Sequence, residues 1–294
     1  MNQHEGASEY TFKDNITING KTLYFEDIVN LDFLVPKNIK KLAASFRSNK
    51  PFHHLVFDGL FSPKLLELVH GDFERIKRKE WARYNSAYEL KNGSLPNTRF
   101  GRASQLYFDT IYSGRFLDFI SNLTAIEGLV TDPILWAGGM HEIPKGGKFA
   151  LHTDFNKHPV TMLDNRLVFI TYLNKDWKPS YGGTLELWDK EQDMCVVKVE
   201  PVFGRSILFY QSASSLHGQP DPVEAPNCQT RRSVAAYYYT NGRPDSQTEK
   251  FHGTIYSTQV DLATLMKFRA NIRSFIPPVL YDLAAGAKHF IQRF

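Results

Sequence analysis

The stretch Phe149-Ala-Leu-His-Thr-Asp154 is a short, mostly apolar run of the kind that forms a β-strand, and it ends in two possible metal ligands. Further short runs rich in β-branched and aromatic residues occur at near-regular spacing, and glycines or prolines separate them. Many short strands with turn residues between them predict a double-sheet β-sandwich or barrel. The predicted strands are residues 149–151, 167–173, 184–188, 195–199, 206–210 and 233–239.

Helical patterns flank this β-rich segment. Ser62 and Pro63 resemble a helix cap and first turn, and apolar residues then recur at helical spacing as far as Ile76. A second helix is predicted over residues 114–123, and the tail beyond Asp245 is expected to be helical. We therefore expect one compact unit with three parts: an N-terminal helical or mixed support region (1–130), a β-rich catalytic core (131–243) and a C-terminal helical extension (244–294).

The composition is that of a globular protein with no strong charge. The 294 residues are 42% hydrophobic, and the formal net charge of +4 is too small to indicate nucleic acid as a partner. Cys195 and Cys228 are too few for a disulfide framework or a thiolate zinc site, which favours a reducing compartment. Residues 1–10 do not resemble a signal peptide, and no run approaches the roughly 18 apolar residues that span a bilayer. These features predict a cytoplasmic protein without a membrane partner; oligomeric state is left open.

The metal-binding prediction starts from His152 and Asp154. Residues i and i+2 of a strand project from the same face, about 6.5 to 7 Å apart, so both side chains can reach one ion. The chain has a second His-x-Asp triplet, His70-Gly71-Asp72, inside the predicted helix that follows Ser62. There the two side chains point about 200° apart, so they are not expected to share a metal.

A third ligand should come from another strand, and His217 follows the apolar run 206–210. Two imidazoles and one carboxylate on one face of an ion are typical of non-haem iron(II) oxygenases, and they leave open positions for other ligands. The alternative is that His217 is an ordinary loop histidine.

Arg231 is the candidate cation for an anionic co-substrate. A buried carboxylate needs a fixed positive partner, and a guanidinium can hold it through two parallel hydrogen bonds. Arg231 begins a predicted strand, so the residues that share its inward face are Ser233, Ala235 and Tyr237, while Arg232 faces the other side. The alternative is that both arginines are surface charges.

With these residues assembled, residues 135–240 resemble the catalytic core of the prolyl-4-hydroxylase-like branch of the iron(II)- and 2-oxoglutarate-dependent dioxygenases, including an uncharacterised bacterial group. The resemblance implies a double-stranded β-helix core (jelly-roll, cupin-like) in a mostly β fold with flanking helices. The motifs that carry it are His-Thr-Asp (152–154), Tyr-Leu-Asn-Lys-Asp-Trp (172–177), Gly-Gly-Thr-Leu-Glu-Leu (182–187), Pro-Val-Phe-Gly-Arg-Ser-Ile-Leu-Phe (201–209), His217, and Arg-Arg-Ser-Val-Ala-Ala-Tyr-Tyr-Tyr (231–239).

The resemblance also implies the roles of single residues. The family's iron ligands fall on His152, Asp154 and His217, and its co-substrate arginine falls on Arg231. Tyr172 matches a tyrosine that binds the same distal carboxylate, and Leu185 matches an apolar wall of the 2-oxoglutarate pocket. Tyr237 matches an aromatic residue beside the metal and is expected, with His141, to face the substrate. His158 is a further candidate, and the alternative for both histidines is an ordinary solvated loop residue.

The function expected from the resemblance is hydroxylation of an unactivated C–H bond with Fe(II), 2-oxoglutarate and O2, giving succinate and carbon dioxide, with ascorbate as a possible reductant. The substrate is a small molecule or a peptidyl or amino-acid group. Prolyl specificity does not transfer, because the stretch 138–147 lacks the tyrosine that prolyl hydroxylases use near their substrate. The alternatives are a non-catalytic β-sandwich binding module and a zinc hydrolase with the same ligands.

Overall fold

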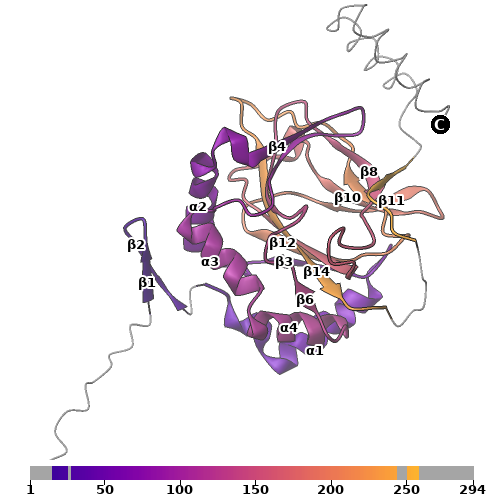
Figure 1. Ribbon diagram of the computed structural model, residues 1–294, viewed down its shortest axis with the longest axis horizontal. Coiled ribbons are helices and arrows are strands. Elements are labelled where there is room, and N and C mark those ends of the chain that lie inside the picture. Colours follow the sequence, from indigo (N-terminus) through magenta and orange to yellow (C-terminus); the bar gives the residue numbers. More distant parts are fainter. Residues whose placement is uncertain (1–14, 26–27, 244–249, 258–294) are drawn as a thin grey trace, which may run out of the picture.

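The computed structural model describes residues 15–25, 28–243 and 250–257. In this part of the chain four α-helices lie on one side of the two larger β-sheets (Figure 1). The helices are α1 (Pro36–Ser48), α2 (Pro63–Asp72), α3 (Arg102–Ile111) and α4 (Gly114–Thr124). The longest of them, α1, has 13 residues, and no helix among the described residues is long and apolar enough to cross a membrane.

The larger sheet has eight strands and packs against the helices. Its path runs β3-β12-β9-β14-β7-β5-β4, and β6 pairs with β14 beside this path. The strands are β3 (His54–Asp58), β4 (Trp81–Asn85), β5 (Leu90–Ser94), β6 (Val130–Thr131), β7 (Gly139–Ile143), β9 (Asp164–Tyr172), β12 (Arg205–Tyr210) and β14 (Arg231–Thr240).

The smaller sheet has five strands and lies on the far side of the larger one from the helices (Figure 1). Its order is β11-β10-β13-β8-β15, and all its pairs are antiparallel. The strands are β8 (Phe149–Thr153), β10 (Leu185–Asp189), β11 (Met194–Val199), β13 (His217–Gln219) and β15 (Ile255–Tyr256); a separate hairpin pairs β1 (Asn15–Ile18) with β2 (Lys21–Tyr24). The predicted mostly β fold with flanking helices is confirmed.

Alternation along the strands of the larger sheet divides the interior into two layers. On β9, Val168 and Tyr172 face the smaller sheet, whereas Phe169 packs against the helices. On β12, Ile207 and Leu208 divide in the same way. The helix side is the more apolar and forms the main core, so the opposite face of the sheet has room for polar groups.

The second His-x-Asp triplet has a structural role. Asp72 ends α2, and its Oδ2 accepts hydrogen bonds from the backbone N–H of Ser104 at 3.0 Å and from the Ser104 hydroxyl at 2.9 Å. Ser104 lies in the first turn of α3, where backbone N–H groups have no partner within the helix. Asp72 therefore caps α3 from a neighbouring helix.

Several elements differ from the sequence-based expectation. The chain before residue 131 contributes β3, β4 and β5 to the larger sheet, in addition to helices. The strands β4 and β5 were not predicted because their polar composition gives no clear strand pattern. Residues 250–257, expected to be helical, contain the strand β15, which pairs with β8. The rest of the predicted C-terminal helical extension (244–249 and 258–294) lies outside the described residues. The division of the chain at residues 130 and 243 stays a prediction.

We predict that Asp72→Ala lowers the free energy of unfolding by about 2 kcal/mol, because two buried donors of Ser104 lose their acceptor. Urea denaturation of the purified variant measures this change. Asp118→Ala, on the exposed face of α4, is the matched control and should change stability by less than about 0.5 kcal/mol. Equal effects of the two substitutions would contradict the capping role.

Candidate functional site

The candidate metal ligands come from two neighbouring strands of the smaller sheet. His152 lies on β8, Asp154 directly follows that strand, and His217 is the first residue of β13. In the antiparallel register His217 is the direct partner of His152, so their side chains leave the same face of the sheet side by side. Gly218 permits this close approach, because a Cβ at that position would lie 2.8 Å from the Ala150 carbonyl oxygen.

The three side chains present one ligand atom each to a common point. These atoms all lie within 4.8 Å of one another, and the two imidazole centroids are 4.4 Å apart. The Nδ1 atom of His152 lies 2.7 Å from the Ala150 carbonyl oxygen, and that of His217 lies 2.8 Å from the Ser215 carbonyl oxygen. Each Nδ1–H therefore donates to the backbone, which turns the Nε2 lone pair toward the common point. Such a set fits a divalent metal ion.

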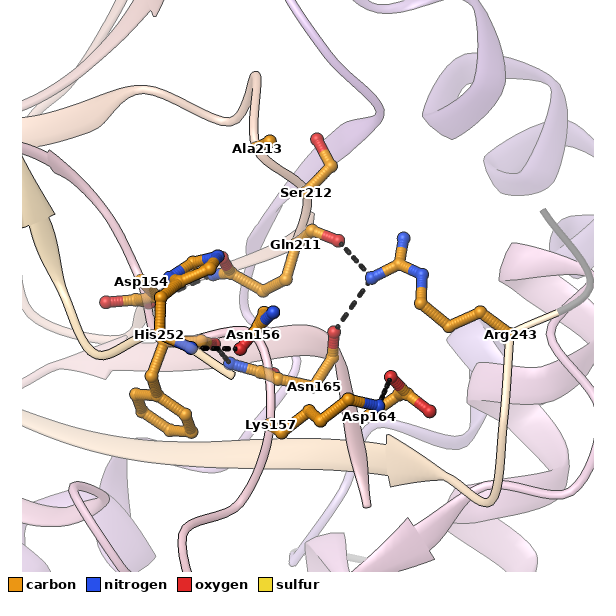
Figure 2. Close-up of a pocket in the computed structure, with 11 residues that line it drawn as sticks. Asp154, Asn156, Lys157, Asp164, Asn165, Gln211, Ser212, Ala213, Arg243 and His252 are labelled. Atoms are coloured by element: carbon orange, nitrogen blue, oxygen red, sulfur yellow. Dashed lines mark hydrogen bonds and ion pairs between the residues drawn. The ribbon is translucent and has the colours of Figure 1, made fainter. Parts of the chain in front are cut away.

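Two neutral side chains orient the carboxylate of Asp154. Gln211 Nε2 donates to Asp154 Oδ2 at 3.1 Å, and the Tyr237 hydroxyl donates to the same oxygen at 3.3 Å. Arg243 in turn donates to the backbone oxygen of Gln211 at 3.2 Å, so Gln211 lies between Asp154 and Arg243 in a small adjoining pocket (Figure 2). These contacts hold the carboxylate in place as outer-shell partners do at metal sites.

Protonation at the site favours metal binding. Burial alone would raise the pKa of Asp154, but the adjacent His152 and His217 side chains and the Lys91 ammonium outweigh it and hold this pKa well below its usual range. Burial, with the neighbouring His152, lowers the pKa of His217 to about 4. Near neutral pH the site therefore contains an ionised carboxylate and a neutral His217 imidazole, the forms that bind metals.

Arg231 lies deep in the same cavity and is only 6% exposed. Its Nε donates to the Gly183 carbonyl oxygen at 2.6 Å, and its guanidinium carbon lies 4.9 Å from the centroid of the Tyr172 ring. Gly183 has φ +72°, and a Cβ there would come within 2.9 Å of the Arg231 side chain, so this turn needs glycine. The Tyr172 hydroxyl lacks a hydrogen bond of good geometry to the described residues, and the fully buried Tyr172 side chain lies behind Arg231 rather than on the cavity wall.

The cavity between the two sheets has a volume of about 380 Å³. Its wall includes the three candidate metal ligands, His152, Asp154 and His217. Arg231 and the apolar side chain of Leu185 also line it. All four residues expected on the inward face of β14 lie on its wall: Arg231, Ser233, Ala235 and Tyr237. Arg232 faces the other side of the sheet, where it pairs with Glu74 at 2.6 Å. A cavity of this size holds a small co-substrate next to the metal ligands.

The two other histidines named from the sequence have different surroundings. His141, on β7, lines the cavity, and its buried Nε2 makes no hydrogen bond to a described residue. His158 is also buried, but it lies off the cavity wall: its Nδ1 accepts from the backbone N–H groups of Val160 and Thr161 at 3.2 and 3.1 Å. Its loop uses the ring to satisfy these two backbone donors, and a contact of His158 with the substrate stays a prediction.

Other cavity residues were not expected from the sequence. Lys91 and Glu89 come from the β4–β5 hairpin, and Tyr256 comes from β15. The hairpin reaches β8 through a hydrogen bond from the Ala150 N–H to the Tyr88 carbonyl oxygen at 2.7 Å. The only sequence signal is that Glu89 and Lys91 are two residues apart, as on one face of a strand. The run around them is too polar to be recognised as a strand that faces the site.

The fold and the site together define a metal-dependent enzyme core of the oxygenase type, and comparison with known proteins agrees. Residues 138–239 match the model of the 2OG-Fe(II) oxygenase superfamily. Over 194 residues, 64% of this chain, the sequence is 22% identical to prolyl 3-hydroxylase OGFOD1 of Mus musculus. The matched part is 33% of that protein, so this chain spans about a third of its relative.

The chain is also similar to solved structures of prolyl hydroxylases. A prolyl hydroxylase from Trichoplax adhaerens, in complex with a hypoxia inducible factor peptide fragment, aligns with a TM-score of 0.50 and 16% identity, covering 69% of this chain and 91% of that one. A prolyl-4-hydroxylase from Pseudomonas putida aligns with a TM-score of 0.49 and 16% identity, covering 68% of this chain and all of the other. Residues 138–239 are thus similar to the 2OG-Fe(II) oxygenase superfamily, as the sequence motifs predicted, and the double-stranded β-helix fold is confirmed.

The buried histidines make stability depend on pH. Burial, together with the charges of Lys91 and Arg231, lowers the pKa of His141 from 6.5 to about 3. Between these values the unfolded chain binds a proton that the folded protein does not, so stability falls as pH falls through this window.

We predict that His141→Gln, which cannot titrate, reduces the loss of unfolding free energy between pH 7.5 and pH 5 by about 2 kcal/mol. Urea denaturation in the presence of a chelator gives the loss for each protein, and His217 contributes equally to both. An unchanged pH dependence in the variant would show that His141 is already charged in the folded protein.

Proposed function

We propose that this protein is a non-haem Fe(II)- and 2-oxoglutarate-dependent dioxygenase that hydroxylates an unactivated C–H bond and gives succinate and carbon dioxide. One observation carries the proposal: two imidazoles and one carboxylate converge within 4.8 Å in a cavity that also contains a buried guanidinium. A β-sandwich that only binds a ligand has no need of this combination. A hydrolytic zinc site accounts for the three ligands but does not explain the buried guanidinium of Arg231 in the same cavity.

Each residue has a defined task in this proposal. His152, Asp154 and His217 hold the iron, and Gln211 and Tyr237 keep the carboxylate oriented. When bound, the iron supplies the reaction with dioxygen that oxidises both the co-substrate and the substrate.

Arg231 binds the distal carboxylate of 2-oxoglutarate, and its hydrogen bond to Gly183 fixes its direction beforehand. Tyr172 donates its hydroxyl to the same carboxylate. Leu185 covers the methylene groups of the co-substrate and keeps water away from them.

The substrate is a small molecule or a peptidyl or amino-acid group that enters the remaining part of the cavity. Tyr237 and His141 face that space. The relatives named above include prolyl hydroxylases, but the sequence of this chain differs from them near the substrate side. Ascorbate as a reductant and a cytoplasmic location complete the proposal; the location is supported by Cys195 and Cys228, which are both free thiols.

We predict that the purified protein with iron(II) releases succinate from 2-oxoglutarate in the presence of oxygen. Asp154→Ala should lower iron(II) affinity at least tenfold and abolish succinate release, because the only anionic ligand of the set is lost. Equilibrium dialysis measures the metal, and chromatography measures succinate. Normal turnover by Asp154→Ala would overturn the proposed ligand set.

The two adjacent arginines provide a matched pair for the co-substrate site. Arg231→Ala should weaken 2-oxoglutarate binding roughly 100-fold, because loss of one partner of a buried charge pair costs on the order of 3 kcal/mol. Arg232→Ala removes the same group from the opposite face of the sheet and should leave the dissociation constant unchanged. Calorimetric titration of manganese(II)-loaded protein without oxygen gives both values. Equal weakening in both variants would contradict the assignment of Arg231.

A further inference from the structure

The cavity contains a second cation that the proposed co-substrate does not use. Lys91 lies on β5, and its ammonium pairs with the Glu89 carboxylate at 3.2 Å. Both side chains line the cavity, and they belong to the chain before residue 138, outside the segment that matches the oxygenase family. We call these two residues the Glu89–Lys91 pair.

The Glu89–Lys91 pair is close to the metal ligands and shielded from water. The side chain of Lys91 is only 13% exposed, and that of Glu89 is only 15% exposed. The Lys91 ammonium lies 3.4 Å from the centroid of the Phe149 ring, and that ring lies 3.9 Å from the ring of His152. One aromatic ring therefore separates the ammonium from a candidate iron ligand. On the other side, the Tyr84 ring centroid is 5.1 Å from the ammonium.

Stability alone does not account for an ion pair in this position. Burial lowers the pKa of Lys91, and Glu89 only partly offsets this effect. The cost of desolvating two charges usually matches or exceeds their attraction, so apolar residues of similar size would stabilise the fold as well or better. A buried pair that faces a cavity is instead suited to exchange partners with a ligand.

The charges around the cavity restrict what that ligand can be. In the proposed enzyme, iron(II) and Arg231 balance Asp154 and the two carboxylates of 2-oxoglutarate. The Glu89–Lys91 pair is neutral as well, so a substrate with a net charge would leave an uncompensated charge in a buried place. A substrate with one positive and one negative group can replace the internal pair by two new ion pairs, and no charge is left over.

We propose that the Glu89–Lys91 pair binds the head group of a small zwitterion, a free α-amino acid, and that this is the substrate class of the enzyme. The inference rests on the proposed function. Glu89 accepts hydrogen bonds from the ammonium group, and Lys91 binds the carboxylate; the two groups are joined through one carbon, so they can face both side chains at once. An internal residue of a peptide has neither charge.

His141 supplies a second, independent feature of this site. Its buried Nε2 lines the same cavity and makes no hydrogen bond to a described residue. The ring packs against Gly93, two residues beyond Lys91 on β5: a Cβ at Gly93 would lie 3.4 Å from His141 Nδ1. His141 therefore offers one more hydrogen bond beside the Glu89–Lys91 pair. Tyr84, Phe149 and Tyr256 provide aromatic walls for the substrate side chain.

Binding to manganese(II)-loaded protein in the absence of oxygen tests the inference without turnover. The protein is first titrated with 2-oxoglutarate and then with an equimolar pool of the twenty protein L-amino acids, while thermal unfolding is followed. A second pool contains the same amino acids as N-acetyl amides. We expect the free pool to raise the unfolding temperature and the blocked pool to leave it unchanged, and calorimetry then gives the dissociation constant of the amino acid that binds best.

Variants of the Glu89–Lys91 pair provide the decisive comparison. Lys91→Met and Glu89→Gln should each weaken binding of that amino acid at least tenfold and change the dissociation constant of 2-oxoglutarate less than twofold. Lys145→Met and Glu224→Gln alter an exposed lysine–glutamate pair at 4.0 Å and should have no effect on either ligand.

The outcomes separate this inference from the proposed function. Failure of the parent protein to bind 2-oxoglutarate overturns the proposed function, and the inference with it. If 2-oxoglutarate binds but the free pool has no effect, the blocked pool is preferred, or both pair variants bind the amino acid as the parent does, the substrate inference alone is overturned.

Discussion

The pairing of His217 with His152 across β13 and β8 is the constraint on which the site depends. Direct partners in an antiparallel sheet point to the same side, so this single register places two imidazoles 4.4 Å apart, although 65 positions separate them in sequence. Asp154 lies two residues after His152 in the sequence, so its carboxylate reaches the same point as the two imidazoles. A shift of the register by one residue would turn His217 to the other face of the sheet and remove it from the site.

Strand alternation also places the polar side chains of the site and the apolar side chains of the core on opposite faces of the larger sheet. β14 places Arg231 and Tyr237 in the cavity, while Val234 and Tyr238 pack against the helices on its other face. The helix-packed layer contains most of the apolar core, and this stable layer supports a cavity that holds buried charges. The cost of burying Arg231 is reduced by its hydrogen bond to Gly183 and its contact with the Tyr172 ring.

The cavity is built partly from the segment that matches the family model and partly from residues outside it. The proposed metal and co-substrate residues lie within residues 138–239, the segment that matches the 2OG-Fe(II) oxygenase superfamily. Glu89, Lys91 and Tyr84 come from the β4–β5 hairpin before that segment, and Tyr256 comes from β15 after it. Part of the cavity wall therefore comes from outside the segment that matches the family model, and substrate selectivity can differ there between relatives.

The sequence by itself determined the β-rich core, the inward face of β14 and the three candidate ligands. Strand alternation and His-x-Asp spacing involve residues that are close together in the sequence, so both can be recognised without the tertiary structure. The tertiary structure alone decided the rest. It assigned His158 to its own loop, Asp72 to the cap of α3, and the Glu89–Lys91 pair to the cavity wall. These assignments depend on contacts between residues far apart in the chain, and the polar hairpin 81–94 has no periodic apolar pattern from which its place in the larger sheet could have been predicted.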